Sequence, residues 1–214
     1  METLRTIEKA AFLAFFPSLT QTQCLQLEAF TRLVLEWNER INLVSRKDTE
    51  HVLTHHIGHS LAPLRYFSFS AGASVLDLGT GGGFPGIPLA IAYPNVQFHL
   101  VDSIAKKIRA VEDMVACLQL SNVRVSRVRA EELTDKYDWV VTRGVAHLQQ
   151  LWQWAQPLLN KVSTHSPNGL IAYKGFPFEE EVVLPNVRTT IIPLRGLLED
   201  DFFDAKCLVH VKLS

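Results

Sequence analysis

Residues 74–86 read Ser74-Val75-Leu76-Asp77-Leu78-Gly79-Thr80-Gly81-Gly82-Gly83-Phe84-Pro85-Gly86. The stretch is typical of a buried strand that runs into a glycine turn, where the backbone approaches a ligand closely. The dinucleotide fingerprint Gly-x-Gly-x-x-Gly needs Gly or Ala at the position of Phe84, and a Walker loop needs a following Gly-Lys-Ser/Thr. Neither requirement is met here. Asp77-x-Gly79-x-Gly81 instead matches the acidic-x-Gly-x-Gly arrangement of enzymes that use S-adenosylmethionine (AdoMet).

The glycine turn makes Asp77, Gly79 and Gly81 candidate cofactor-binding residues, with the strand-end carboxylate facing the amino acid part of AdoMet. Phe84 is either a further cofactor contact or part of the core. Asp102 ends the next predicted strand, where an acidic residue accepts hydrogen bonds from ribose hydroxyls. The alternative role of Asp102 is to cap the helix that follows.

Three later strand ends add further candidates. Ala130 and Glu131 follow the third predicted strand, where an adenine edge would be read, although Glu131 and Glu132 are equally typical of a solvated helix start. Arg143 follows the fourth predicted strand, at the carboxyl edge where open α/β sheets bind ligands, and its alternative is a surface salt bridge. Lys174 is similarly placed after the fifth, with a substrate phosphate contact and a structural role both open.

Short β-branched runs alternate with helical stretches after residue 70. The predicted strands are 74–78, 96–101, 123–128, 139–142, 170–173, 189–193 and 207–211, and the predicted helices are 104–118 and 148–159. Such alternation predicts an α/β fold with a parallel sheet and helices on both faces. The last two strands have no helical pattern between them, so they predict an antiparallel pair at one edge of the sheet.

The first part of the chain has a different pattern, with apolar residues at helical spacing. Thr20 and Gln23 form a predicted capping box before an amphipathic helix of about five turns. A second helix is predicted over 51–66. We therefore expect a helical amino-terminal extension over 1–70 and an AdoMet-binding core over 71–214.

The composition limits the class of protein. The chain has 214 residues, 47% of them hydrophobic, with 21 Lys and Arg against 22 Asp and Glu. Apolar content this high excludes a disordered chain, and a net charge of −1 excludes a protein that coats nucleic acid through bulk charge. No apolar run reaches the roughly 18 residues that span a bilayer, and the three cysteines form neither a disulfide framework nor a zinc site. We expect a cytoplasmic protein without membrane contact.

Histidines and basic residues form two local clusters. His51, His55 and His59 are predicted to share a helix face, but no Cys is near and Glu50 faces elsewhere. A solvated, partly charged face is favoured, and no metal is expected. Residues 103–130 carry six basic side chains against two acidic ones, which predicts either a basic patch beside the cofactor edge or a solvated helix face. The six are Lys106, Lys107, Arg109, Arg124, Arg127 and Arg129.

Motifs over most of the chain resemble one family, the bacterial small-subunit ribosomal RNA methyltransferases first named glucose-inhibited division protein B. They are Trp37-Asn38-x-x-Ile41-Asn42-Leu43, Asp77-Leu78-Gly79-Thr80-Gly81 through Phe84-Pro85-Gly86-Ile87-Pro88-Leu89, Asp102-Ser103 with Lys106-Lys107-x-Arg109, Thr142-Arg143-Gly144 and Ala172-Tyr173-Lys174-Gly175. Gly82, Phe84 and Gly144 stand where the family usually has Pro, Leu and Ala. His56-Ile57-Gly58-His59-Ser60 replaces the family's His-Ile-Leu-Asp-Ser, so any role of that acid is not carried over.

The resemblance implies a class I AdoMet-dependent methyltransferase with a Rossmann-like sheet. It further implies methylation of N7 of a guanine, guanine 527, in the decoding-region loop of 16S rRNA, with the small ribosomal subunit as partner. By the same resemblance Gly79, Phe84, Ala130, Glu131 and Arg143 contact AdoMet. The complete candidate cofactor set is Asp77, Gly79, Gly81, Phe84, Asp102, Ser103, Ala130, Glu131 and Arg143, and the candidate catalytic residues are Arg143 and Lys174. We expect a monomer.

The implied chemistry needs few groups. Guanine N7 has an in-plane lone pair, so it attacks the sulfonium methyl without first losing a proton, and no general base is required. The enzyme has to align the reacting atoms and to extract the guanine from stacking. Arg143 is the first candidate for this positioning and Lys174 the second. The alternatives are an AdoMet-dependent enzyme acting on a small molecule and a non-enzymatic nucleotide-binding module.

Overall fold

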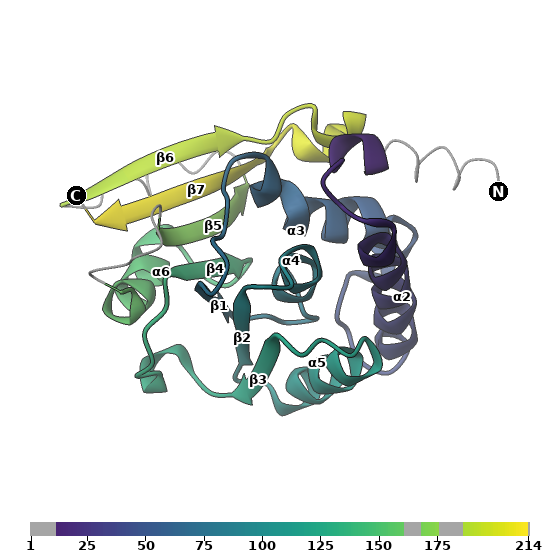
Figure 1. Ribbon diagram of the computed structural model, residues 1–214, viewed down its shortest axis with the longest axis horizontal. Coiled ribbons are helices and arrows are strands. Elements are labelled where there is room, and N and C mark those ends of the chain that lie inside the picture. Colours follow the sequence, from purple (N-terminus) through teal and green to yellow (C-terminus); the bar gives the residue numbers. More distant parts are fainter. Residues whose placement is uncertain (1–11, 161–167, 176–185, 214) are drawn as a thin grey trace.

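The computed structural model describes residues 12–160, 168–175 and 186–213, which contain a seven-stranded sheet in the order β3-β2-β1-β4-β5-β7-β6 (Figure 1). The strands are β1 (Ser74–Leu78), β2 (Gln97–Asp102), β3 (Val123–Arg127), β4 (Trp139–Arg143), β5 (Gly169–Gly175), β6 (Val187–Pro193) and β7 (Lys206–Leu213). β1 to β5 are parallel, β7 is antiparallel to β5, and β6 is antiparallel to β7. The predicted α/β fold and the antiparallel pair are confirmed, with β6 at the edge.

The helices surround the parallel part of the sheet. The α-helices are α2 (Gln21–Asn38), α3 (His59–Leu61), α4 (Gly86–Ala92), α5 (Ala105–Cys117) and α6 (Leu148–Ala155). The other helical segments are η1 (Arg46–His51), η2 (Val52–Gly58), η3 (Ala62–Arg65), η4 (Ala130–Glu132), η5 (Gln156–Leu158), η7 (Leu197–Glu199) and η8 (Asp201–Phe203). The sequence gives no helical period for α4, because its residues 86–91 are all buried.

The two faces of the sheet carry separate apolar clusters. Val75 and Trp139 belong to the cluster that includes α2, α4 and α5, whereas Leu76 and Val140 pack with α6. This alternation follows from the two-residue period of a strand, whose successive side chains point to opposite faces. Figure 1 shows α6 on one side of the sheet and α4 and α5 on the other, with α2 as an outer layer.

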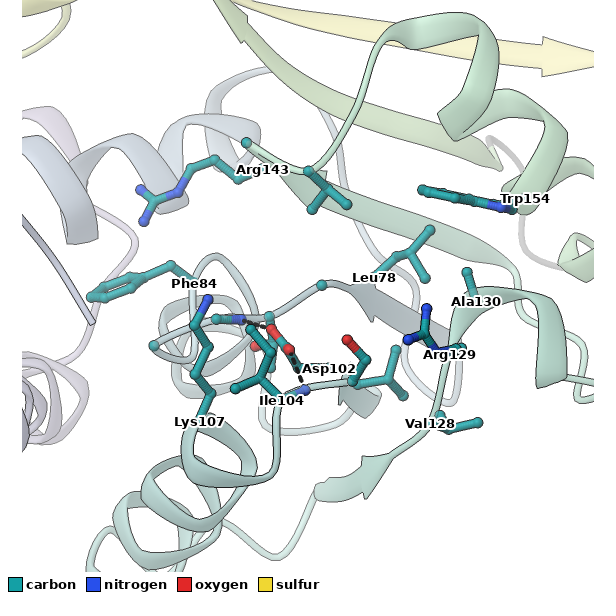
Figure 2. A pocket seen from close by; sticks show the side chains of 18 of the residues that line it. Leu78, Phe84, Asp102, Ile104, Lys107, Val128, Arg129, Ala130, Arg143 and Trp154 are labelled. Carbon is teal, nitrogen blue, oxygen red and sulfur yellow. Dashed lines mark hydrogen bonds between the residues drawn. The ribbon is translucent and has the colours of Figure 1, made fainter. Parts of the chain in front are cut away.

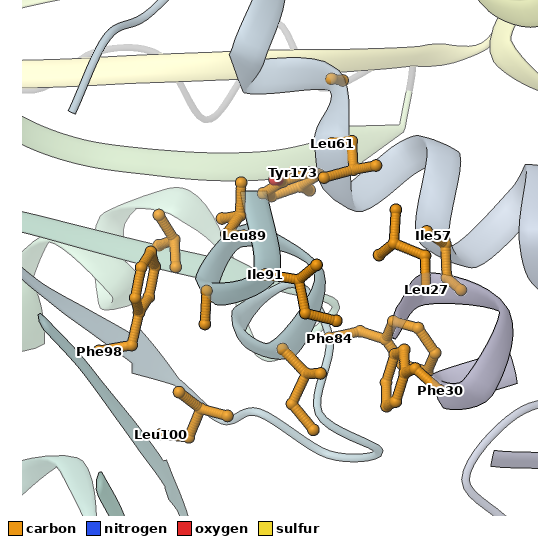
Figure 3. Packing of buried hydrophobic residues seen from close by; sticks show 14 of the residues in the cluster. Leu27, Phe30, Ile57, Leu61, Phe84, Leu89, Ile91, Phe98, Leu100 and Tyr173 are labelled. Atoms are coloured by element: carbon orange, nitrogen blue, oxygen red, sulfur yellow. The ribbon is translucent and has the colours of Figure 1, made fainter. Parts of the chain in front are cut away.

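Helix α2 begins and packs as predicted. Thr20 and Gln23 form the capping box, with Gln23 N–H donating to Thr20 Oγ1 and Thr20 N–H donating to Gln23 Oε1 at 2.8 Å. Phe30 is fully buried, and its ring centroid lies 5.1 Å from that of Phe84 in the glycine turn (Figure 3). Burial of a Phe side chain contributes about 1.5–3 kcal/mol. The amino-terminal helix therefore supports the glycine turn from behind.

The helical region predicted over 51–66 begins earlier in the structure and is irregular. Helical geometry runs from η1 through η3 and passes through the π-helical η2, whose i→i+5 bonds change which residues share a face. His51 stays exposed and stacks on His55, but His59 is only 6% exposed. The expectation of one solvated histidine face is therefore wrong for His59.

Both predicted parts of the chain contribute to one core. The larger apolar cluster contains Phe30 and Leu61 from the first 70 residues together with Phe98 and Ile171 from the sheet. The division into 1–70 and 71–214 stays a prediction. In the described part of the chain, no helix has the length and apolar character needed to cross a membrane.

Candidate active site

The glycine turn after β1 depends on residues without a side chain. Gly79 has a φ of +76°, in the left-handed region, and a Cβ there would lie 2.5 Å from Cγ2 of Val145. A Cβ on Gly86 would lie 2.5 Å from Oδ2 of Asp77 and 2.7 Å from Cγ of Leu100. These close approaches fold the turn tightly over the end of β1.

Asp77 lies beneath this turn and has no exposed surface. Its Oδ2 accepts a hydrogen bond from the Gly86 N–H at 2.9 Å, which ties the end of the turn to β1. Burial raises the pKa of Asp77 to about 7, against the opposing influence of the Thr80 hydroxyl and the Gly86 N–H. The Thr80 hydroxyl is near the carboxyl, but among the described residues neither Asp77 Oδ1 nor Thr80 Oγ1 has a partner with full hydrogen-bond geometry. The carboxyl group is thus held beneath the loop and does not line the surface that a ligand would contact.

A cavity of about 410 Å³, called here the glycine-loop cavity, opens at the carboxyl ends of β1, β2 and β4 (Figure 2). Its lining includes Leu43, Leu78, Gly79, Thr80, Gly81, Gly82, Phe84, Val101, Asp102, Ser103, Ile104, Lys107, Val128, Arg129, Ala130, Glu131, Arg143, Gly144, Val145 and Trp154. Eight of the nine predicted cofactor-binding residues line it, and Asp77 is the exception. The cavity falls in the size range of small-molecule sites, about 300–1,000 Å³.

Asp102 accepts two backbone hydrogen bonds at the end of β2, and its contact with the ribose stays a prediction. Its Oδ1 accepts from the Ile104 N–H at 2.9 Å, next to the start of α5, and its Oδ2 accepts from the Gly81 N–H at 3.1 Å. The carboxylate therefore joins the glycine turn to the end of β2 (Figure 2). Each carboxylate oxygen accepts more than one hydrogen bond, so Asp102 keeps acceptor capacity for a ligand in the cavity.

Arg143 is half-buried at the end of β4 and is held by His56 from η2. Its Nη1 donates to the His56 carbonyl oxygen at 3.2 Å and its Nη2 donates to His56 Nδ1 at 3.3 Å. The guanidinium carbon also lies 4.8 Å from the centroid of the Phe84 ring. Burial lowers the pKa of Arg143 to about 10, which leaves the guanidinium charged at neutral pH.

His56 is neutral in this arrangement. Burial and the charge of Arg143 lower the pKa of His56 to about 4. We assign its proton to Nε2, because that atom lies 2.8 Å from Asp48 Oδ2 and the other ring nitrogen accepts from Arg143. Asp48, His56 and Arg143 thus form a chain of hydrogen bonds that fixes the guanidinium beside Phe84.

A second cavity of about 300 Å³, called here the histidine cavity, adjoins the first. Its lining includes His55, His56, His59, Arg143, Gly144, Tyr173, Lys174, Gly175, Phe202 and Lys206. The cavities share Arg143 and Gly144. Lys174 lies in the histidine cavity alone, with its Nζ donating to the Ala146 carbonyl oxygen at 2.9 Å. The two predicted catalytic residues therefore meet at the second cavity and not at the glycine loop.

Several lining residues were not found from the sequence. Trp154 lies in a predicted helix but is not a predicted site residue, and Phe202 and Lys206 lie in the segment between the last two predicted strands, which has no helical pattern. In the predicted basic patch, Lys107 and Arg129 line the glycine-loop cavity. No group of three or more His, Cys, Asp or Glu side chains in the described ranges is placed to hold a metal ion.

Comparison with known proteins gives consistent results. A family model described as rRNA small subunit methyltransferase G matches residues 23–191. The chain is 43% identical to Ribosomal RNA small subunit methyltransferase G of Bacteroides fragilis, with 94% of this chain and 98% of that protein covered. It is 41% identical to the proteins of the same name from Cytophaga hutchinsonii, covering 92% and 96%, and Flavobacterium johnsoniae, covering 94% and 97%.

Solved structures share the fold at low sequence identity. A SAM-dependent methyltransferase from Aquifex aeolicus (SAM is AdoMet) has a TM-score of 0.53 at 17% identity, covering 78% of this chain and 94% of that one. A ribosomal protein L11 methylase from Lactobacillus delbrueckii subsp. bulgaricus has a TM-score of 0.53 at 14% identity, covering 78% and 79%. The predicted class I methyltransferase fold is therefore confirmed.

Proposed function

The chain belongs to the rRNA small subunit methyltransferase G family, and from that membership we propose that it transfers a methyl group from AdoMet to N7 of a guanine in 16S rRNA. The observation that supports this most strongly is the gathering of eight predicted cofactor residues around one cavity that Arg143 connects to a second. The family resemblance supplies the choice of N7 and of guanine 527.

The residues of the glycine-loop cavity fit AdoMet. Apolar side chains of Leu78, Val128 and Trp154 suit the adenine ring, and the Asp102 carboxylate at the end of β2 suits the ribose hydroxyls. Beneath the loop, the unpartnered Oδ1 of Asp77 belongs to a carboxyl with a pKa near neutrality. A cationic ligand above it favours the charged form, which suits the positive sulfonium and ammonium groups of AdoMet.

The protein's task in the reaction is alignment. AdoMet supplies a methyl group on a positively charged sulfur. The lone pair of guanine N7 would form the new bond to the methyl carbon while the carbon–sulfur bond breaks, and the electron pair of the broken bond would remain on sulfur. The positive charge would thereby pass to the purine, and no proton would be transferred. We assign Arg143 the positioning of the guanine, because it stands between the two cavities with its guanidinium fixed by His56 and Phe84.

Lys174 is proposed to contact a substrate phosphate, because this basic residue lines the cavity next to the cofactor cavity. The substrate partner is proposed to be the small ribosomal subunit, with the protein acting as a monomer in the cytoplasm. Neither Arg143 nor Lys174 is assigned as a base, since N7 has no proton to lose.

The test is a transfer assay with radiolabelled AdoMet. Unmethylated small ribosomal subunits, naked 16S rRNA and a pool of small metabolites are offered separately, and labelled RNA is hydrolysed to identify the modified base. We expect 7-methylguanine from one or both RNA substrates. Label that enters metabolites only would replace the proposal by the small-molecule alternative. If calorimetry detects no AdoMet binding, both methyltransferase proposals are wrong and the non-enzymatic nucleotide-binding module is the remaining alternative.

A further inference from the structure

We propose that the histidine cavity receives the target guanine as an unstacked base, with an adjacent phosphate bound by Lys174 and Lys206. The proposal rests on the proposed function, and it adds residues from outside the part of the chain that the family model matches. Phe202 and Lys206 lie beyond residues 23–191. The carboxyl-terminal segment would thus form part of the substrate site.

The position of the cavity is the first argument. It shares Arg143 and Gly144 with the glycine-loop cavity, so a base within it lies next to the cofactor. Gly144 has a φ of +66°, and a Cβ at this position would have no neighbour within 4 Å. At Gly144, therefore, no side chain separates the two cavities. A volume of about 300 Å³ suits one base better than a larger ligand.

The charges are the second argument. Three cationic side chains line the cavity, Arg143, Lys174 and Lys206, and no carboxylate is among its described lining residues. His56 and His59 have lowered pKa values, in both cases mainly through burial, so they are neutral at pH 7. A neutral, polar interior with cations around it matches a nucleotide, whose base is uncharged and whose phosphate is an anion.

The aromatic wall is the third argument. His55 and Phe202 stack with a centroid distance of 3.9 Å and an interplanar angle of 6°. His59 packs edge-on against Tyr173 at 5.1 Å, and its Nε2 has no hydrogen-bond partner among the described residues. His55 also stacks on His51 at 4.5 Å, and the Lys206 ammonium lies 4.8 Å from the centroid of the Phe202 ring. The stacked rings therefore hold the Lys206 ammonium beside the cavity, where it can meet a phosphate.

The wall depends on a local feature of this chain. A Cβ on Gly58 would lie 2.4 Å from Cδ1 of Leu198, so the missing side chain lets the segment after β6 approach η2. His55 Nε2 then lies 3.0 Å from Asp200 Oδ2, and the Phe202 ring reaches His55. The contact between these two distant segments places Phe202 and Lys206 at the cavity.

The first test compares two lysines on one strand. Lys206→Glu reverses a charge at the cavity, and Lys212→Glu makes the same change on the same strand, six residues away. We expect Lys206→Glu to raise KM for small subunits by about tenfold or more, with unchanged AdoMet affinity in calorimetry, whereas Lys212→Glu stays within about twofold of wild type. Equal KM values for the two variants, with both proteins folded by circular dichroism, would overturn the proposal.

The second test does not depend on activity. Guanosine 5′-monophosphate is titrated into the full chain saturated with S-adenosylhomocysteine, and binding is followed by ligand-detected NMR. We expect saturable binding to wild type and Lys212→Glu, and a loss of about tenfold or more in affinity for Lys206→Glu. Binding that is unaffected by Lys206→Glu, or that occurs only when S-adenosylhomocysteine is left out, contradicts the assignment. Inactivity of the wild type towards every RNA would refute the proposed function, while this titration still decides the cavity.

Discussion

The glycine-loop cavity and the histidine cavity share Arg143 and Gly144 but are built in different ways. The first is built around one turn of left-handed glycines and the ends of adjacent parallel strands, which bring both backbone and side chains to its lining. The second is made of side chains from three segments that are far apart in the sequence, η2 with α3, the ends of β4 and β5, and the segment after η7. A short motif specifies the first, whereas tertiary packing specifies the second.

This difference assigns different tasks to the two sites. A glycine turn at the ends of the strands lets the backbone approach a ligand closely, which suits an invariant cofactor. A side-chain site is adjusted by single substitutions, which suits a particular substrate. Arg143 belongs to both, because β4 brings its backbone to the cofactor edge while His56 and Asp48 hold its guanidinium. Substitutions that change cofactor binding at one cavity or substrate binding at the other, but not both, test this assignment of tasks.

Arg143→Ala is expected to have the largest effect, because it removes the side chain that the cavities share. We predict a loss of about 100-fold or more in kcat/KM for small subunits, as for other preorganised charged groups at a reacting centre. The melting temperature is expected to change by only a few degrees, because the side chain is half-buried and remains partly solvated. Steady-state transfer assays and thermal melting measure the two quantities.

Arg143→Lys is the matched variant, since it keeps the charge and loses the planar fork that donates to two atoms of His56. We expect it to recover less than a tenth of wild-type kcat, roughly, if fixed geometry and not charge alone is required. Turnover at the wild-type level in either variant would remove Arg143 from the site.

Gly79→Ala is expected to weaken the cofactor cavity alone. The Cβ would lie 2.5 Å from Cγ2 of the exposed Val145, so this cavity-lining side chain or the turn has to shift, and we predict a loss of about tenfold or more in AdoMet affinity. Gly72→Ala is the control, because Gly72 has a similar φ of +81° with no atom within 4 Å of the added Cβ. Both variants lose roughly 1 kcal/mol of stability from left-handed strain, but only Gly79→Ala should change the calorimetric Kd for AdoMet. Equal Kd values would mean that the turn is not the cofactor cradle.

The sequence allowed the parallel sheet and most of the cofactor cavity to be predicted, because both depend on local patterns. Alternating strands and helices specify the order of the elements, and Asp77-x-Gly79-x-Gly81 specifies the turn after the first strand. The predicted strands agree with the structure to within a few residues. Asp77 is fully buried beneath the loop, where its carboxyl accepts from the Gly86 N–H, and its role towards the cofactor stays a prediction.

The histidine cavity was not predicted, because no local pattern contains it. A four-residue histidine spacing predicts one exposed face on an α-helix, but the π-helical η2 changes the register and His59 turns into the core. Phe202 reaches His55 only because Gly58 leaves room for Leu198. Contacts of this kind depend on the packing of segments more than a hundred residues apart, which periodicity does not report.

Asp77→Asn is expected to have a moderate effect that depends on pH. The carboxyl pKa is 3.8 when unfolded and about 7 when folded, so the folded chain binds more protons between these values. Its stabilising contribution is present below the unfolded pKa and is lost as pH rises through the folded pKa. The Asn variant should therefore gain in melting temperature relative to wild type as pH rises from about 4 to about 7. A constant difference across this range would contradict a buried neutral carboxyl.

The affinity for AdoMet should depend on the ionisation of Asp77 in the opposite way to the stability of the folded chain. A bound cation favours the charged carboxylate, so wild-type affinity should increase as pH rises through about 7, by less than tenfold per pH unit for one proton. Calorimetry of the Asn variant is expected to show a flatter profile. Parallel profiles for the two proteins would separate Asp77 from cofactor binding.

The smallest predicted effect concerns salt and decides which cavity meets the RNA backbone. With a net charge of −1, phosphate contacts have to come from local cations. Besides Arg143, which is assigned to the guanine, these include Lys174 and Lys206 at the histidine cavity and Lys107 and Arg129 at the glycine-loop cavity. Each neutralised phosphate on single-stranded RNA contributes about −0.7 to the slope of log K against log salt concentration, so about four contacts give a shallow slope near −3. Lys206→Ala should reduce its magnitude by about 0.7. An equal reduction by Lys107→Ala would place phosphates at both cavities, whereas no reduction by Lys206→Ala would contradict their division into a cofactor site and a substrate site.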